Sequence, residues 1–176
     1  MLNDYITMFA GAVFAVIVLY AARHALRKFA GFELPSWAMP AAAGAAMLAA
    51  SVWNEYHWYP DTLTRMGERV EVISANEDAA PWRPWTYLWP ITTRFAVLDR
   101  QSLAAAPAPG VVTATLYFVA RWQKVQPVMV AYDCVARKQA VLGGEAVVNA
   151  DGTLSAGQWL AAAEGDEGLK AACAEK

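Results

Sequence analysis

The chain has 176 residues, which is enough for one ordinary domain and a short additional segment. Its formal net charge is −2, and no segment repeats Lys and Arg in a pattern that could follow a phosphate backbone, which excludes nucleic acid as the main partner. Hydrophobic residues make up 57% of the chain and charged residues only 17%, a more apolar balance than a typical soluble domain has. The apolar excess is concentrated near the N-terminus, which predicts a membrane protein.

The first apolar segment, residues 5–22, is 18 residues long, contains no charge and is rich in Val, Ile, Leu and Phe. About 20 apolar residues in a helix cross the hydrocarbon core of a bilayer, so we predict a transmembrane helix here. A cleaved signal peptide has a similar apolar core but begins with positive charges. No Lys or Arg precedes this segment, and we therefore expect the helix to be retained as an anchor.

A second uncharged segment, residues 34–54, is dominated by alanine. We predict a helix over about residues 37–56, so that residues 1–54 form a transmembrane helical hairpin. Small residues recur at every fourth position, which in lipid is typical of a helix that lies close against another helix. The alternative to a partner helix is a self-contained hairpin with a simple alanine bias, in which Gly11 offers a matching surface. We assign three small residues to contact with a partner subunit: Ala42, Ala46 and Ala50.

A basic cluster lies between the two apolar segments, in the predicted loop of residues 23–33, and consists of Arg23, Arg27 and Lys28. Positive charges in short loops remain in the cytoplasm. This rule places the loop inside the cell, and the N-terminus and all residues after 54 outside. Alanine is abundant and Arg outnumbers Lys, as in bacteria with GC-rich genomes, so the predicted location is the bacterial inner membrane with a periplasmic domain.

The chain has two cysteines, Cys134 and Cys173, and both lie in the part placed outside. An even number of cysteines in an oxidising compartment predicts a disulfide, with two unrelated buried thiols as the alternative. A bridge that closes a loop of this length stabilises a fold by about 4 kcal/mol in the chain-entropy model, which is large for a small domain.

Aromatic residues lie at the end of the second predicted helix and directly after it. Trp and Tyr concentrate at the headgroup level of a membrane, so we assign four of them to the outer membrane interface: Trp53, Tyr56, Trp58 and Tyr59. After Pro60, residues 61–69 are predicted to form a short helix capped by Asp61, and residues 69–73 a first strand.

Residues 80–90 contain three Trp, one Tyr and three Pro, which excludes a regular helix or a central strand. They lie within residues 55–110, which we predict to be a juxtamembrane region, rich in aromatic residues and Pro, that also holds the first strands. The segment can cover the core of the domain, lie on the membrane surface or contact a partner, and these three roles remain open. In a partner interface, the aromatic anchors are Trp82, Trp85 and Trp89.

The remaining residues have an α+β pattern. Two short C-terminal helices are expected, one capped by Ser155 and continuing through residues 159–163 and the other at residues 167–173. The predicted fold class is a membrane-anchored α+β protein, with a two-helix transmembrane hairpin followed by a small, mainly antiparallel β-sheet domain. Stretches rich in Val, Thr, Tyr and Phe predict strands at residues 95–98, 111–123, 128–135 and 145–148.

The C-terminal third carries several short motifs: Tyr132-Asp133-Cys134, Arg137, Asp151-Gly152, Trp159, Gly168-Leu169 and Cys173. In this pattern the chain resembles the bacterial surface-adhesin protein E-like domain over residues 111–176. The resemblance implies a small sheet-based domain in which Cys134 pairs with Cys173 and ties the terminal helix to the sheet. Members of that family are typically outer-membrane lipoproteins, whereas this chain has a helical anchor and no lipobox cysteine, so host-protein binding is not carried over.

No arrangement of residues predicts catalysis. The two histidines, His24 and His57, are placed on opposite sides of the bilayer, about 30 Å apart, and cannot share a metal. No zinc, haem or phosphate-binding motif occurs, and the paired carboxylates Glu77 and Asp78 fall in a predicted turn. We therefore expect a protein that is not an enzyme and uses no cofactor, metal or small-molecule substrate.

Two functional hypotheses follow from these features. The first is a non-catalytic accessory or assembly subunit of a larger bacterial inner-membrane complex, such as a secretion, pilus, conjugation or respiratory machine. Its partners would be membrane lipid and other membrane protein subunits. The second is a stand-alone periplasmic binding, sensing or adhesin-like module.

Overall fold

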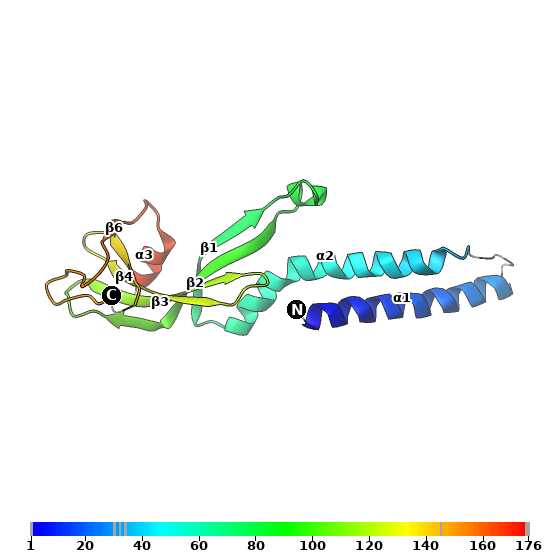
Figure 1. The fold of residues 1–176 in the computed structure, drawn as a ribbon, viewed down its shortest axis with the longest axis horizontal. Helices are drawn as coiled ribbons and strands as arrows, with labels where there is room; N and C mark the ends of the chain where they lie inside the picture. The colour runs from blue at the N-terminus through cyan, green and yellow to red at the C-terminus, as the bar shows by residue number, and fades with distance from the viewer. Residues whose placement is uncertain (1, 30, 32, 34, 145, 175–176) are drawn as a thin grey trace. The chain divides into compact units, whose positions relative to one another are not determined.

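The computed structural model describes residues 2–29, 31, 33, 35–144 and 146–174. Within them the chain is an α+β protein with an N-terminal apolar helix and a curled antiparallel sheet (Figure 1). The chain divides into two compact units, Met1–Trp58 and Tyr59–Lys176.

The first unit contains α1 (Leu2–Phe29) and most of α2 (Ala38–Met66). Among the described residues, α1 is the one helix that is long and apolar enough to cross a membrane, over Tyr5–Phe29, a test that an N-terminal signal sequence also passes. α2 does not pass it. The structure thus shows one candidate span where the sequence predicts two.

The predicted end of the first helix at residue 22 is wrong, because α1 continues to Phe29. Arg23, Arg27 and Lys28 therefore lie on the last turns of a helix rather than in a loop. Basic side chains are favourable there, since the C-terminus of a helix carries partial negative charge. Residues 30, 32 and 34 of the predicted connecting segment lie outside the described residues.

The second predicted helix is also longer than expected. α2 continues through Pro60 to Met66, so the separate helix predicted for residues 61–69 is wrong. Pro60 lacks one backbone N–H, but its carbonyl oxygen accepts a hydrogen bond from the Thr64 hydroxyl at 2.8 Å. The helix ends where Gly67, at φ +74°, donates its N–H to the Leu63 carbonyl at 3.1 Å, as a C-terminal glycine cap does.

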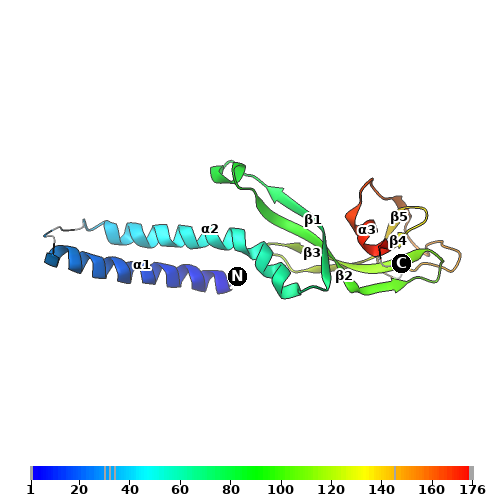
Figure 2. The same cartoon turned by 180° about the vertical axis from the view of Figure 1, so that it is seen from behind.

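The second unit is built on one six-stranded antiparallel sheet in which each strand pairs with the next along the chain (Figure 2). A short helix, α3 (Glu167–Cys173), lies against the sheet, and its predicted bounds are confirmed. The strands are β1 (Val70–Asp78), β2 (Ile91–Ala105), β3 (Val111–Ala120), β4 (Gln126–Asp133), β5 (Lys138–Leu142) and β6 (Leu160–Ala161).

The core lies mainly between the sheet and α3. Side chains alternate between the two faces of a strand, so Val130 and Tyr132 face α3, whereas Ala131 faces a second, smaller cluster that contains Val148 and packs against Trp159. The main cluster consists of Leu98, Ala114, Leu116, Val130, Tyr132, Leu169, Ala171 and Ala172.

Three predictions between β5 and α3 are corrected. β5 was not predicted, and the helix expected at residues 159–163 is instead the short strand β6. The hydroxyl of Ser155, the expected cap, accepts the Val147 N–H at 2.9 Å and so closes a local turn. Of the strand predicted at residues 145–148, residue 145 lies outside the described residues, and Val148 forms only an isolated bridge with Leu154. Strands of two to five residues are too short to give a clear periodic signal.

Candidate functional site

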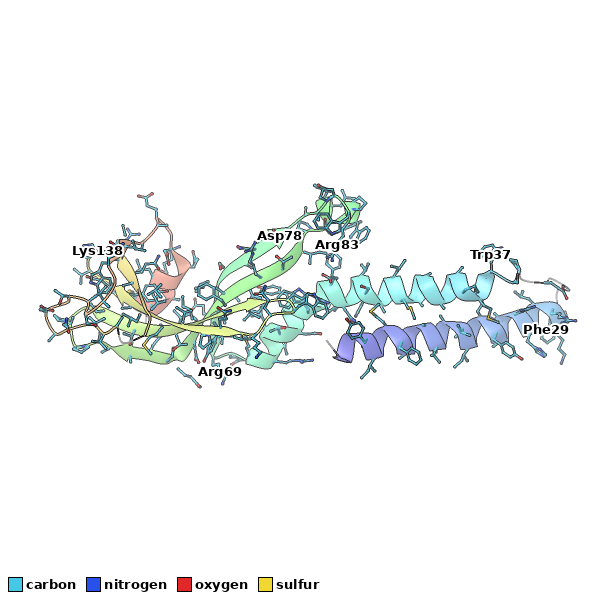
Figure 3. The ribbon with its side chains drawn as sticks, in the orientation of Figure 1. Phe29, Trp37, Arg69, Asp78, Arg83 and Lys138 are labelled. Carbon is cyan, nitrogen blue, oxygen red and sulfur yellow. A yellow bond between two sulfur atoms is a disulfide. The ribbon has the colours of Figure 1, made fainter. Side chains whose placement is uncertain are left out.

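The loop between β1 and β2, residues 79–90, closes a long hairpin, and we name it the aromatic tip. The hairpin strands pair up to Asp78 and Ile91, and the loop between them contains a 3-10 helix, η1 (Pro84–Tyr87). Figure 3 shows Asp78 at the base of this loop and Arg83 within it. The prediction that these residues form neither a regular helix nor a central strand is confirmed.

A single buried threonine organises the tip. Thr86 is 1% exposed, and its hydroxyl donates to the Arg83 carbonyl at 2.7 Å while accepting the Ala80 N–H at 2.9 Å. At the base, the Thr93 hydroxyl donates to the Asp78 carboxylate. The loop is therefore held by its own hydrogen bonds.

The large side chains of the tip point outward. Trp82 is 76% exposed, Trp89 63% and Trp85 38%, and Tyr87 and Leu88 are also exposed. The three tryptophans therefore do not cover the core, which leaves the membrane surface and a partner as their possible contacts. Isolated exposed apolar residues are common, but five large ones in one loop are typical of an interaction surface.

The sequence analysis missed a second group of exposed side chains, in the turn between β3 and β4. We name Arg121–Val125 the basic–aromatic turn; the sequence predicts a strand over residues 111–123, whereas β3 ends at Ala120. Trp122 is 50% exposed, and the Arg121 guanidinium lies 4.6 Å from its ring centroid. Since consecutive strands alternate in direction, this turn and the aromatic tip lie at the same end of the sheet, and the Arg121 N–H donates to the Thr93 carbonyl at 3.1 Å. The sequence signal that could have revealed this turn is the short, mainly polar stretch of residues 121–124 between two apolar runs.

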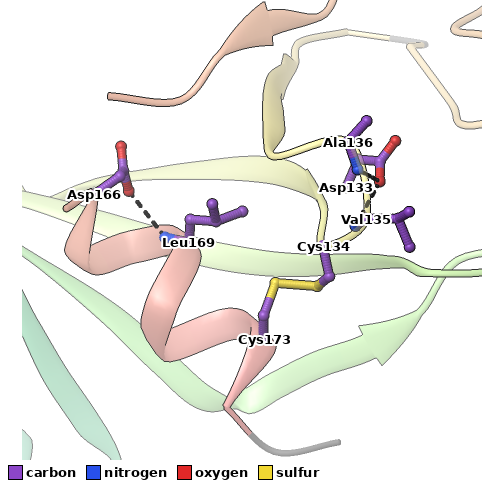
Figure 4. Close-up of a disulfide and its surroundings, with 7 residues drawn as sticks. All are labelled: Asp133, Cys134, Val135, Ala136, Asp166, Leu169 and Cys173. Carbon is purple, nitrogen blue, oxygen red and sulfur yellow. Dashed lines mark hydrogen bonds between the residues drawn. A yellow bond between two sulfur atoms is a disulfide. The ribbon is translucent and has the colours of Figure 1, made fainter. Parts of the chain in front are cut away.

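The two cysteines form the disulfide Cys134–Cys173, with the two Cα atoms 5.8 Å apart (Figure 4). The neighbouring Asp133 carboxylate accepts the N–H groups of Val135 at 2.9 Å and Ala136 at 2.8 Å and so shapes the turn after β4. At the start of α3, the Asp166 carboxylate accepts the Leu169 N–H at 2.9 Å as an N-cap.

The buried tyrosine of the Tyr132-Asp133-Cys134 motif lies directly beneath α3. A Cβ atom placed on Gly168 would come within 2.6 Å of the Tyr132 hydroxyl oxygen, so α3 reaches this depth only with glycine at that position. Burial, together with the nearby negative charge of Asp166, raises the pKa of Tyr132 to about 12. This hydroxyl is thus protonated at neutral pH and serves packing.

The remaining motifs of the C-terminal third are also structural. The Trp159 indole N–H donates to the Gly152 carbonyl at 3.0 Å. Hydrogen bonds from the Thr153 hydroxyl and backbone N–H lower the pKa of the Asp151 carboxyl and hold this turn. The motifs therefore account for the shape of the domain rather than for a chemical site.

In the first unit, the predicted close approach of small residues occurs within the chain. A Cβ atom placed on Gly11 of α1 would lie 3.9 Å from the Ala50 Cβ and 4.0 Å from the Ala46 carbonyl oxygen. Ala12 is buried, at 5% exposure. Ala46 and Ala50 thus pack against α1, and Ala42 is half-buried.

The four predicted interface aromatics all lie on α2. Trp53 stacks on His57, with ring centroids 3.8 Å apart, and His57 Nδ1 lies 2.9 Å from the Trp53 carbonyl oxygen. The structure therefore gives His57 a packing role. Tyr59 belongs to the second unit, where its ring packs edge-on against the buried Phe95 of β2 at a centroid distance of 5.0 Å. Tyr56 and Trp58 are half-buried.

In the described part of the chain, no group of three or more His, Cys, Asp or Glu side chains could hold a metal ion. No family model matches the chain, and no curated protein or solved structure is similar to it. The exposed large side chains of the sheet domain are most concentrated in the two turns at one end of the sheet, and these turns are the candidate functional site.

Proposed function

We propose that this protein is a non-catalytic accessory or assembly subunit of a larger bacterial inner-membrane complex and exposes its sheet domain in the periplasm. The observation that carries the proposal is the aromatic tip. It is a loop held by its own hydrogen bonds, yet it exposes five large apolar side chains on a chain that also has an apolar helix of membrane-spanning length.

Membrane anchoring is supported by the first unit. Tyr5–Phe29 has the length of a span, and its last turns carry Arg23, Arg27 and Lys28, which favour the cytoplasmic side. In the proposal, α2 crosses the membrane as a second helix, although it is too weakly apolar to do so on composition alone. Its contact with Gly11 supports this role, because close packing of small residues stabilises helix pairs in lipid.

The periplasmic location is supported by the Cys134–Cys173 disulfide, since such bonds persist in oxidising compartments. Two independent features, the basic end of α1 and the disulfide, favour the same orientation. In this orientation Trp53, Tyr56 and Trp58 lie at the end of the second span, at the outer interface.

Orientation is tested by impermeant thiol labelling of intact spheroplasts carrying Ala25→Cys or Ala150→Cys. We expect labelling at position 150 and none at position 25. Labelling at position 25 alone would reverse the topology and remove the basis for a periplasmic disulfide.

The partner contact is assigned to the tip because of how it is built. Trp and Tyr side chains that insert into a partner often contribute most of the binding energy of an interface, about 2 kcal/mol or more each on truncation. A loop that is already ordered loses less conformational entropy on binding. Trp82, Trp85 and Trp89 are therefore proposed as the anchors.

The direct test is extraction of the native protein in mild detergent, followed by size-exclusion chromatography. We expect the protein to elute with other membrane proteins in one large, defined assembly. Elution as a lone monomer under conditions that preserve other inner-membrane complexes would contradict the proposal and favour a stand-alone binding or sensing module.

A further inference from the structure

We propose that the Thr86 hydroxyl is the positioning group of the aromatic tip and holds Trp82 and Trp85 in the arrangement that the partner binds. This inference rests on the function proposed above, because it concerns how the same surface recognises its partner. It assigns control of that contact to a residue that is only 1% exposed and therefore acts through the side chains around it.

The tip consists of two short backbone segments, each of which carries an exposed tryptophan. In the first, the Arg83 N–H donates to the Ala80 carbonyl at 2.9 Å and closes a turn that carries Trp82. The second is η1, which carries Trp85 and ends where the Trp85 carbonyl accepts the Trp89 N–H at 3.0 Å. Three of the twelve residues of the tip are proline and have no N–H to donate, so the backbone offers few hydrogen bonds to join the two segments.

The Thr86 hydroxyl joins these segments. It lies within η1, yet it donates to the Arg83 carbonyl at 2.7 Å and accepts the Ala80 N–H at 2.9 Å, so it reaches both ends of the turn that carries Trp82. The Thr86 N–H adds a further hydrogen bond to the Arg83 carbonyl at 2.8 Å. Valine has no hydroxyl and can form neither of the two side-chain bonds. The placement of Trp82 relative to Trp85 therefore depends on one buried hydroxyl.

The strength of the contact follows from this placement. A partner that contacts both tryptophans binds only those molecules in which they are correctly arranged, and its apparent dissociation constant rises in proportion as that fraction falls. A net hydrogen bond changes an equilibrium constant by about two- to tenfold, and the hydroxyl forms two of them. Neither core cluster contains a residue of the tip, so we expect the sheet domain to fold without this hydroxyl.

The test compares the full chain with Thr86→Val and Thr86→Ser after extraction of the native assembly in mild detergent. Size-exclusion chromatography over a dilution series measures the ratio of assembled to free protein. Thr86→Val should lower this ratio at least about fivefold, because two hydrogen bonds are lost. Thr86→Ser keeps the hydroxyl and should hold the ratio within about twofold of the native value.

Ser102 on β2 provides the matched control, because its hydroxyl forms the same kind of bond pair away from the tip. It donates to the Asp99 carbonyl, three positions earlier, at 2.6 Å and accepts the Thr115 N–H at 2.7 Å. Ser102→Ala removes both bonds and should leave the ratio of assembled to free protein unchanged. A release caused by a general loss of stability would appear in both variants.

Fluorine NMR of the full chain labelled with fluorotryptophan reports on the indoles directly. Each resonance is assigned by its loss in the corresponding Trp→Phe variant. Thr86→Val should shift or broaden the resonances of Trp82 and Trp85 and leave that of Trp159, which packs against a core cluster, unchanged. Ser102→Ala should leave the two tip resonances unchanged.

A failure of the tip can be told apart from a failure of Thr86. If Trp82→Ala leaves the assembly intact, the tip is not the contact surface and the proposed function fails with it. If Trp82→Ala releases the protein but Thr86→Val does not, the tip binds without help from the hydroxyl. Equal release by Thr86→Val and Thr86→Ser, equal release by Ser102→Ala, or unfolding of the sheet domain in Thr86→Val would each overturn the positioning role.

Discussion

Tryptophan has opposite roles in two regions of the sheet domain. Near the C-terminus, Trp159 packs against a core cluster and its indole N–H donates to the Gly152 carbonyl. In the aromatic tip the tryptophans are exposed, and the buried residue is the small, polar Thr86. A tip built for folding would place indoles inside and a hydroxyl outside. In the function proposed above, this inverted arrangement leaves the indoles of the tip available for contact, whereas Trp159 stabilises the C-terminal region.

The largest expected loss of stability follows from removing the disulfide of the C-terminal region. Cys134→Ser should remove the cross-link between α3 and the sheet and lower the free energy of unfolding by about 4 kcal/mol. Urea denaturation of the purified chain measures this loss. Mass spectrometry of a non-reduced digest supplies the control, and free thiols at both positions in fresh membranes would contradict the bridge.

The second expected effect is the loss of stability in alkali. The pKa of Tyr132 is raised to about 12, so the folded state keeps its proton after the unfolded state has lost it. The resulting stabilisation is fully present below pH about 10 and is lost as pH rises toward 12, amounting to roughly 2–3 kcal/mol. Unfolding midpoints measured across this range should fall less steeply for Tyr132→Phe than for the native chain. Equal slopes would show that the hydroxyl is not buried beneath α3.

A somewhat smaller effect is expected at the contact between α3 and Tyr132. Gly168→Ala places a Cβ atom within 2.6 Å of the tyrosine oxygen, and overpacking of this kind typically costs about 1–3 kcal/mol. Combining it with Tyr132→Phe removes that oxygen and should recover part of the loss. Calorimetry of the two single variants and the double variant measures this coupling, and additive losses would count against the contact.

The sequence predicts those parts of the fold that depend on neighbouring residues, and it fails where a feature depends on contacts between residues far apart in the chain. The bounds of α3, the strand character of residues 70–73 and the absence of a regular helix or central strand in the tip follow from local patterns. The continuity of α2 through Pro60 does not, because it coincides with the packing of Tyr59 on Phe95, 36 positions further along the chain. Local propensity alone stops a helix at proline.

The residues of the candidate site likewise fall into those that the sequence predicts and those that only the structure reveals. Trp82, Trp85 and Trp89 are conspicuous in the sequence, and only their exposure needed the structure. Trp122 was hidden in a run of strand-forming residues, and its importance depends on a positive φ and on the neighbouring Arg121. Ala46 and Ala50 lie near Gly11 of the same chain, which only the structure reveals, and their assignment to a partner stays a prediction.

The smallest expected effect on stability belongs to the tip and tests the central claim most directly. Trp82→Ala should change the free energy of unfolding by less than about 0.5 kcal/mol, because Trp82 is 76% exposed, yet release the protein from its detergent-extracted assembly. Val141→Ala, which truncates an exposed side chain on β5, should preserve both properties. If Trp82→Ala unfolds the domain, or leaves the assembly intact, the tip is not the surface through which this protein acts.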